Sequence, residues 1–136
     1  MGLRNVSVMP VLAIDDLDRA IGFYRDKLGF NVKTAEQMGD SAVVEVGSSG
    51  YLFLYKTAFR RGENTVASFM VDDLRGSVRE LRGRGVVFED YDLPDLKTVD
   101  GIVDMGEGVE GAFFKDSEGN TIGISTNFVE ALRKAA

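Results

Sequence analysis

The stretch Ile14-Asp15-Asp16-Leu17 occurs a second time as Val71-Asp72-Asp73-Leu74, displaced by 57 residues (72 − 15 = 57). Each copy follows a short apolar run and precedes a helix-like pattern that ends near a glycine, Gly29 in the first copy and Gly85 in the second. A unit of half this chain's length rarely buries enough apolar surface by itself. The repeat therefore predicts two similar modules that share one core.

The residues around the first copy predict a strand, a helix and three further strands. The helix is expected to begin at Asp15 or Asp16, because a short acidic side chain accepts the free N–H groups of a first helical turn. Its apolar residues recur on one face, and Gly29 suits the left-handed position that ends a helix. The expected strands of this module span residues 6–14, 30–36, 41–46 and 51–56.

The second module repeats this order with a shorter helix, which carries Leu74, Val78 and Leu81 on one face. Residues 92–108 are rich in glycine and acidic residues, and this composition predicts a long loop. Within one domain over residues 1–136, we expect module one at about 6–57, module two at about 64–127 and a terminal helix at about 128–136. The expected strands of module two span residues 65–71, 86–91, 111–115 and 121–126.

Composition narrows the class of protein. The 136 residues are 44% hydrophobic and carry a net charge of −6, which does not favour contact with nucleic acid phosphates. No apolar run approaches the ~20 residues that span a bilayer, so we expect no membrane partner. The chain has no cysteine and no histidine, which removes disulfides, thiolate zinc sites and the commonest metal ligand. We expect a cytoplasmic protein.

Two stretches carry a resemblance to a known family. They are Ile14-Asp15-Asp16-Leu17-Asp18-Arg19-Ala20-Ile21-Gly22-Phe23-Tyr24-Arg25-Asp26-Lys27-Leu28-Gly29-Phe30 and Phe113-Phe114-Lys115-Asp116-Ser117-Glu118-Gly119-Asn120. The sequence resembles the vicinal oxygen chelate superfamily, which includes glyoxalases, bleomycin-resistance proteins and extradiol dioxygenases. The resemblance implies an α+β fold of two βαβββ modules, whose mixed sheet is cupped around one ligand cavity with the helices outside. It also implies a homodimer.

Metal-dependent members of that superfamily hold a divalent ion through four residues on four central strands, usually His and Glu. Aligned with those positions, this chain has Met9, Phe53, Val66 and Gly123, none of which is a competent ligand for a catalytic divalent ion. We therefore expect no metal and no other cofactor, and we expect the usual metal-dependent chemistry to be lost. Glu45, Asp104 or Glu110 could instead hold magnesium or calcium, although their spacing does not form a compact oxygen-ligand loop.

Strand alternation divides the predicted strands into two faces. One face is uniformly apolar and suits packing under the helices, whereas the other mixes apolar, aromatic and hydroxyl groups, which suits a small-molecule pocket. A closed core in which large side chains fill the cup is the alternative. The candidate ligand-binding residues on the mixed face are Met9, Val11, Phe53, Tyr55, Val66, Ser68, Gly123 and Ser125.

Three classes of function fit these observations. The first is a bleomycin-resistance-like protein that binds a small, partly aromatic or apolar ligand without a metal, for drug or metabolite sequestration. The second is an enzyme of the same superfamily, a lyase, isomerase or dioxygenase that is metal-independent or uses a cryptic metal. No catalytic residue can be named for it, and the sequence leans against catalysis. The third is an interaction domain that binds no ligand.

Overall fold

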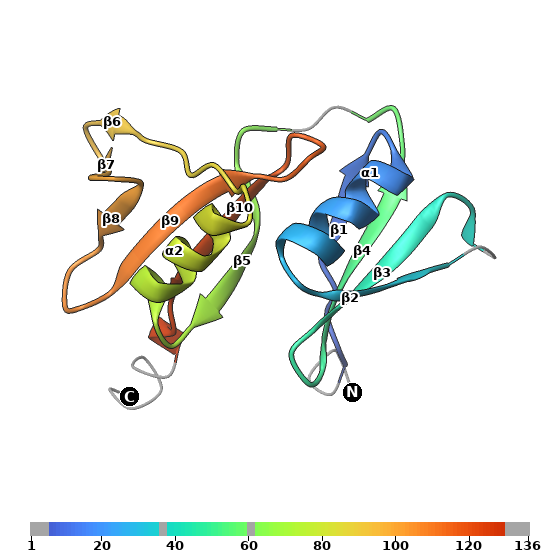
Figure 1. Ribbon diagram of the computed structural model, residues 1–136, viewed down its shortest axis with the longest axis horizontal. Helices are drawn as coiled ribbons and strands as arrows, with labels where there is room; N and C mark the ends of the chain where they lie inside the picture. Colours follow the sequence, from blue (N-terminus) through green and yellow to red (C-terminus); the bar gives the residue numbers. More distant parts are fainter. Residues whose placement is uncertain (1–5, 36–37, 60–61, 130–136) are drawn as a thin grey trace. The chain divides into compact units, whose positions relative to one another are not determined.

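The computed structural model describes residues 6–35, 38–59 and 62–129. The chain forms two compact units that meet in sequence between Arg60 and Arg61. Each unit contains one four-stranded mixed sheet and one helix that crosses a face of that sheet (Figure 1). Within the described ranges no helix is long and apolar enough to cross a membrane.

The first unit has the element order that its sequence predicts. Strand β1 (Val11–Ile14) is followed by α1 (Leu17–Gly22) and one turn of π-helix, η1 (Phe23–Lys27). The remaining strands are β2 (Asn31–Thr34), β3 (Ser41–Val46) and β4 (Gly50–Lys56). In the sheet the strand order is β1-β4-β3-β2, with β1 parallel to β4 and the other pairs antiparallel.

The second unit repeats this topology. Strand β5 (Thr65–Val71) leads into α2 (Leu74–Gly83), and the sheet is completed by β8 (Ile102–Asp104), β9 (Glu110–Lys115) and β10 (Thr121–Thr126). The strand order is β5-β10-β9-β8, with β5 parallel to β10. Two short strands, β6 (Asp92–Leu93) and β7 (Leu96–Lys97), form a separate small hairpin. The expected α+β architecture of two βαβββ modules is therefore confirmed.

The aspartates of the repeated stretch start both helices. The side chain of Asp16 accepts the backbone N–H of Arg19, and that of Asp73 accepts the backbone N–H of Gly76, each at 3.0 Å. These contacts satisfy N–H groups that have no partner inside the helix. Both repeated stretches thus act as helix caps, as their spacing predicts.

A π-helical turn explains why two neighbouring aromatic residues are both buried. The backbone N–H of Leu28 bonds the carbonyl of Phe23 at 3.1 Å, five residues back, which widens the last turn of the helix. Phe23 and Tyr24 consequently both lie in the core, with their rings in edge contact at 5.5 Å between centroids. Gly29 follows with a φ of +82°, as expected for the residue that ends the helix.

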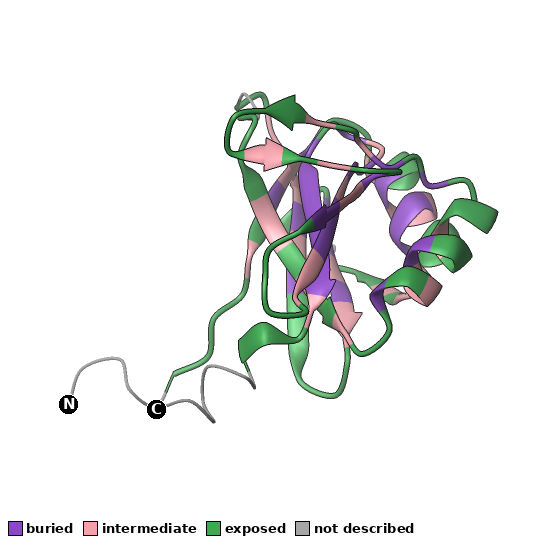
Figure 2. Cartoon of the chain, turned by 90° about the vertical axis from the view of Figure 1, so that its left-hand side faces the viewer, coloured by how far each residue is buried: buried purple, intermediate pink, exposed green. Residues whose placement is uncertain are grey.

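The apolar face of each sheet packs under its helix, and Figure 2 shows the buried centres of the strands in purple. Alternation predicts this face correctly on the inner strands, whereas Ala67, Phe69 and Val71 of the edge strand β5 are only half-buried. The residues of this core on the inner and first strands are Leu12, Ile14, Ala42, Val44, Leu52, Leu54, Ala112, Phe114, Ile122 and Ile124.

Two predicted strands differ from the structure. The first strand begins at Val11, not at Val6, because Pro10 has no N–H to extend the ladder to β4. Residues 86–91 form only an isolated bridge, between Phe88 and Phe114, and the expected loop 92–108 instead contains β6, β7 and β8. Of the expected terminal helix, Phe128 and Val129 are helical, and residues 130–136 lie outside the described part of the chain.

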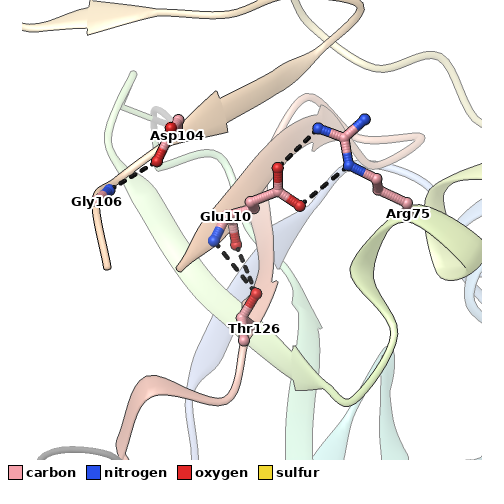
Figure 3. A network of polar contacts seen from close by, with 5 residues as sticks. All are labelled: Arg75, Asp104, Gly106, Glu110 and Thr126. Atoms are coloured by element: carbon pink, nitrogen blue, oxygen red, sulfur yellow. Dashed lines mark hydrogen bonds and ion pairs between the residues drawn. The ribbon is translucent and has the colours of Figure 1, made fainter. Parts of the chain in front are cut away.

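An ion pair joins α2 to the sheet of its unit. The guanidinium of Arg75 donates to both carboxylate oxygens of Glu110, at 2.7 and 3.2 Å (Figure 3). The backbone N–H of Glu110 in turn donates to the hydroxyl of Thr126 at 3.2 Å. This chain of contacts connects α2, β9 and β10.

We predict that Asp73→Ala lowers the free energy of unfolding by about 1 kcal/mol, because the first turn of α2 loses its side-chain cap. The matched variant Asp72→Ala removes the neighbouring carboxylate, which is not the N-cap, and should change stability by less than about 0.5 kcal/mol. Urea denaturation of both variants measures the difference. Equal losses in the two variants would contradict the assignment of the cap to Asp73.

Candidate functional site

The face of each sheet that does not carry the helix is here called the second face. In the first unit it holds Phe53 and Tyr55 of β4, which are half-buried and stacked at 6.4 Å with an interplanar angle of 13°. Phe53 pairs in register with Val11 on β1 and with Val43 on β3. The side chains next to the aromatic pair on the neighbouring strands are therefore apolar.

In the second unit the second face is centred on Gly123 of β10. Its register partners are Ser68 on β5 and Phe113 on β9. A Cβ at position 123 would lie 2.9 Å from the Ser68 hydroxyl and 3.4 Å from the methyl of Thr65. The Ser68 side chain and the Thr65 methyl thus already take up the place of a side chain at position 123, which explains the glycine.

Position 66 lies at an irregularity of β5. Thr121 pairs with Thr65 and Ile122 pairs with Ala67, so Val66 has no register partner on β10. Such a bulge changes the direction of the side chains around it. It brings Thr65 to the same side as Ser68, and Ser68 rather than Val66 is the direct neighbour of Gly123.

Ser125 lies one step along the same face of β10. It pairs with Met70 on β5 and with Gly111 on β9, and the methyl of Met105 occupies the space where Gly111 lacks a side chain. Only 4% of Ser125 is exposed. Among the described residues its hydroxyl is the one buried side-chain polar atom without a hydrogen-bond partner. A buried polar group of this kind costs stability, so it calls for an explanation.

The structure gathers some of the sequence-predicted site residues and separates others. Ser68, Gly123 and Ser125 lie together on the second face of the second unit, and Phe53 and Tyr55 lie together in the first. Met9 precedes β1 and is 40% exposed, and Val11 is 55% exposed on the edge strand β1. Val66 stands at the bulge.

Sequence reasoning missed three residues of the second face: Thr65, Phe113 and Tyr91. The register between β9 and β10 across the turn 116–120 was a usable signal, because it places Phe113 opposite Gly123. The ring of Tyr91 contacts that of Phe113 at 5.7 Å between centroids, with an interplanar angle of 82°. No local pattern indicates the position of Tyr91 or the bulge that turns Thr65.

The donor groups at the superfamily's metal positions do not fit a divalent ion. Met9, Phe53, Val66 and Gly123 supply no carboxylate or imidazole, and no group of three His, Cys, Asp or Glu residues comes together in the described ranges. Of the carboxylates considered as alternatives, Glu45 pairs with Lys33 at 3.2 Å and Glu110 with Arg75. Asp104 accepts the N–H of Gly106 at 2.8 Å (Figure 3).

A separate groove of about 660 Å³ runs beside α1 and η1 in the first unit. Its basic residues are already engaged, since Arg25 pairs with Asp26 at 2.9 Å and Lys33 pairs with Glu45. The groove therefore presents little uncompensated positive charge. It is lined by Asp18, Ile21, Arg25, Val32, Lys33 and Thr34.

Comparisons with known proteins agree with this architecture. Residues 7–47 match the sequence profile of a family described as bleomycin resistance protein-like N-terminal. The crystal structure of UcmS2 is 21% identical and superposes with a TM-score of 0.70, covering 90% of this chain and 98% of that one. No curated protein sequence matches the chain.

Two further solved structures are similar. One is a member of the glyoxalase/bleomycin resistance protein/dioxygenase superfamily from Sphaerobacter thermophilus, with 20% identity, a TM-score of 0.68 and coverage of 90% of this chain and 98% of that chain. The other is TnmS3, an antibiotic binding protein from Streptomyces sp. CB03234, with 20% identity, a TM-score of 0.62 and coverage of 90% and 97%. The solved structures show that the chain shares their fold, and the profile match covers its residues 7–47.

We predict that Ser125→Ala raises the free energy of unfolding by about 1 kcal/mol, because the folded state no longer buries an unpaired hydroxyl. Ser41 is the matched control: it is 1% exposed, but its hydroxyl donates to the carbonyl of Ala35 at 3.1 Å. Ser41→Ala should therefore lower stability by about 1 kcal/mol. Urea denaturation gives both values. A loss of stability in Ser125→Ala would show that this hydroxyl has a partner in solution.

Proposed function

We propose that the protein binds a small, partly aromatic or apolar molecule on the second faces of its sheets without a metal, and so sequesters a drug or metabolite. The observation that carries this proposal is the Ser125 hydroxyl, buried and unpaired beside Gly123. A binding protein can accept the cost of such a group when a ligand supplies the missing hydrogen bond. A purely structural sheet gains nothing from it.

The aromatic side chains of the second faces support the same proposal. Phe53 and Tyr55 are stacked and only half-buried in the first unit, and Phe113 and Tyr91 meet edge to face in the second. Aromatic rings with a few placed polar groups are typical of small-molecule sites. The similar structure TnmS3 is described as an antibiotic binding protein, which agrees with this reading.

The affinity of such a ligand can be estimated from the apolar surface that it would bury. Burial of about 200 Å² of apolar ligand surface contributes on the order of 5 kcal/mol before the costs of association. Hydrogen bonds to Ser125 and Ser68 would then orient the ligand more than they strengthen its binding. Small aromatic probes should therefore bind with Kd values in the millimolar range, and larger antibiotics more tightly.

The proposal predicts that aromatic antibiotics or aromatic metabolites raise the melting temperature, because a ligand that binds only the folded state stabilises it. Phe53→Glu should abolish the shift by placing a charge among apolar contacts. Phe59→Glu is the control, since Phe59 is 73% exposed and lies outside both sheets. Ser125→Ala should bind more weakly although the free protein is more stable. No shift with any compound at millimolar concentration would favour an interaction domain without a ligand.

Metal independence gives a second prediction. The thermal shift produced by an aromatic probe should be the same with and without EDTA, because no residue at the superfamily's metal positions can hold the ion. Metal analysis of protein purified without chelator should find less than one equivalent of zinc, nickel or iron. One equivalent of bound metal ion per chain would instead support a metal-dependent enzyme.

The homodimer and the shared cup stay predictions from the resemblance, and the cytoplasmic location stays a prediction from composition. A dimer would place one copy's module against another copy's, so that each cavity draws on two chains. Light scattering after size exclusion measures the assembly state directly. A mass equal to one chain of 14.9 kDa would remove the dimer from the proposal.

A further inference from the structure

The outer strand of the second sheet is interrupted. Phe88 bridges Phe114 and Ile102 pairs with Ala112, both antiparallel to β9. An unbroken strand would place residue 90 opposite Ala112, but Ile102 stands there, so twelve residues (102 − 90 = 12) leave the sheet. This segment, residues 90–101, is called the excursion, and it contains the small hairpin β6–β7. The first unit has no counterpart, since η1 leads directly into β2.

The excursion rejoins the sheet through a two-residue turn. Val99 and Ile102 exchange both of their backbone hydrogen bonds, at 2.9 and 3.0 Å, and Asp100 and Gly101 lie between them. Asp100 has a φ of +53° and Gly101 a φ of +77°, as a type I′ turn requires. Because both central residues have a positive φ, such turns favour Asn-Gly, Asp-Gly or Gly-Gly.

Position 101 requires glycine for two reasons. Its φ is positive, and a Cβ there would lie 3.0 Å from both the guanidinium of Arg82 and the Cβ of Phe88. The residue before it is an aspartate, and Asp100-Gly101 is the one Asp-Gly or Asn-Gly pair in the 136 residues. The turn therefore fixes an Asp-Gly pair at the end of the excursion.

An Asp-Gly pair is chemically labile. The backbone nitrogen of the glycine can attack the side-chain carboxyl carbon of the aspartate, so that a C–N bond forms, one water molecule leaves and a succinimide ring results. Water then opens the ring at either carbonyl and gives aspartate or isoaspartate, in which the main chain runs through the side-chain carbon. Glycine favours this reaction because it has no side chain to hinder the attack. The reaction needs no reactant except water.

Side chains hold both ends of the peptide group between Asp100 and Gly101. Its carbonyl oxygen accepts a hydrogen bond from the guanidinium of Arg82 on α2 at 2.6 Å, and its N–H donates to the carboxylate of Asp90 at 2.8 Å. That carboxylate also accepts the hydroxyl of Thr98 at 2.9 Å, which helps to fix its position. Both bonds to the peptide group have a charged partner, and such bonds are stronger than neutral ones. We call this pair of bonds the clamp.

The clamp opposes the movement that ring closure needs. The ring can close only after the peptide group turns about the Cα–C bond of Asp100 and brings its nitrogen to the carboxyl carbon. A peptide group is planar, so its N–H and its carbonyl oxygen turn together, and both bonds of the clamp would have to break. Asp100 is exposed to water, so access of water does not limit the reaction.

We propose that Asp100 is the site at which this chain forms isoaspartate, and that the clamp of Arg82 and Asp90 keeps the folded protein from forming it. Isoaspartate would add one carbon to the main chain of a two-residue turn and disturb the paired bonds between Val99 and Ile102. This inference does not depend on ligand binding to the second faces, so either can fail without the other.

The first test compares the folded full chain with the free peptide of residues 98–115, which trypsin releases between Lys97 and Lys115. Both are incubated at neutral pH below the melting temperature of the protein, and fragmentation mass spectrometry then separates isoaspartate from aspartate in this peptide. We expect isoaspartate to form at Asp100 at least about tenfold more slowly in the folded chain, because the reaction has to wait for local opening. Equal rates would overturn the protection.

Variants separate the clamp from the turn itself. Asp90→Ala and Arg82→Ala each remove one of the two hydrogen bonds, and each should speed the formation of isoaspartate at Asp100 about five- to tenfold. Asp92→Ala on β6 and Arg79→Ala on α2 are the matched controls, because both residues are exposed and lie outside the clamp. These controls should react at the wild-type rate. If Asp90→Ala and Arg82→Ala also keep the wild-type rate, the role of the clamp is wrong.

Two Asp-Ser pairs in other parts of the fold, Asp40-Ser41 and Asp116-Ser117, report on general unfolding in the same digests. A loss of the clamp should raise isoaspartate at Asp100 and leave both Asp-Ser pairs at their wild-type level. An equal rise at all three places in both variants would assign the effect to general unfolding and overturn the clamp.

Discussion

The hydrogen bonding of β10 on both of its edges is the constraint on which the candidate site depends. The strand runs parallel to β5 and antiparallel to β9, and this double pairing decides which side chains meet. Gly123 is set between Ser68 and Phe113, and Ser125 is set between Met70 and Gly111. A shift of one residue in either ladder would turn the groups of that neighbouring strand to the helix face.

The two units share one topology but carry different residues on their second faces. In both, the first strand of the module pairs in parallel with the last, and an aspartate-capped helix follows the first strand. The fourth strand carries the large ring of Phe53 in the first unit, where the fourth strand of the second unit carries Gly123. Aromatic side chains therefore lie on the second face of both units, and the second unit adds the hydroxyl groups of Ser68 and Ser125.

The interrupted outer strand shows how a repeated module acquires a new feature. An excursion of this length would be entropically costly if it were loose. Here one carboxylate, that of Asp90, satisfies an amide and a hydroxyl at its base. The sheet keeps a bridge on one side of the excursion and a paired strand on the other. Residues can then be added to a binding face without disturbing the core beneath it.

The sequence alone determined the parts of this protein that depend on neighbours along the chain. Repeated Asp-Asp-Leu stretches indicated both helix starts, and alternation indicated the faces on which Leu12, Leu54 and Ile122 are buried. The absence of histidine is also plain from the sequence, whereas the loss of metal ligands at positions 9, 53, 66 and 123 stays a prediction from the resemblance.

Tertiary structure decided what depends on pairing between distant strands. The bulge that removes Val66 from register, the contact of Tyr91 with Phe113 and the burial of Ser125 have no local signature. Each arises from the register of β10 with its two neighbours, or from where a segment leaves β9 and returns to it. Periodicity reports which face a residue takes on a regular strand, but only the assembled sheet fixes which residue stands beside it.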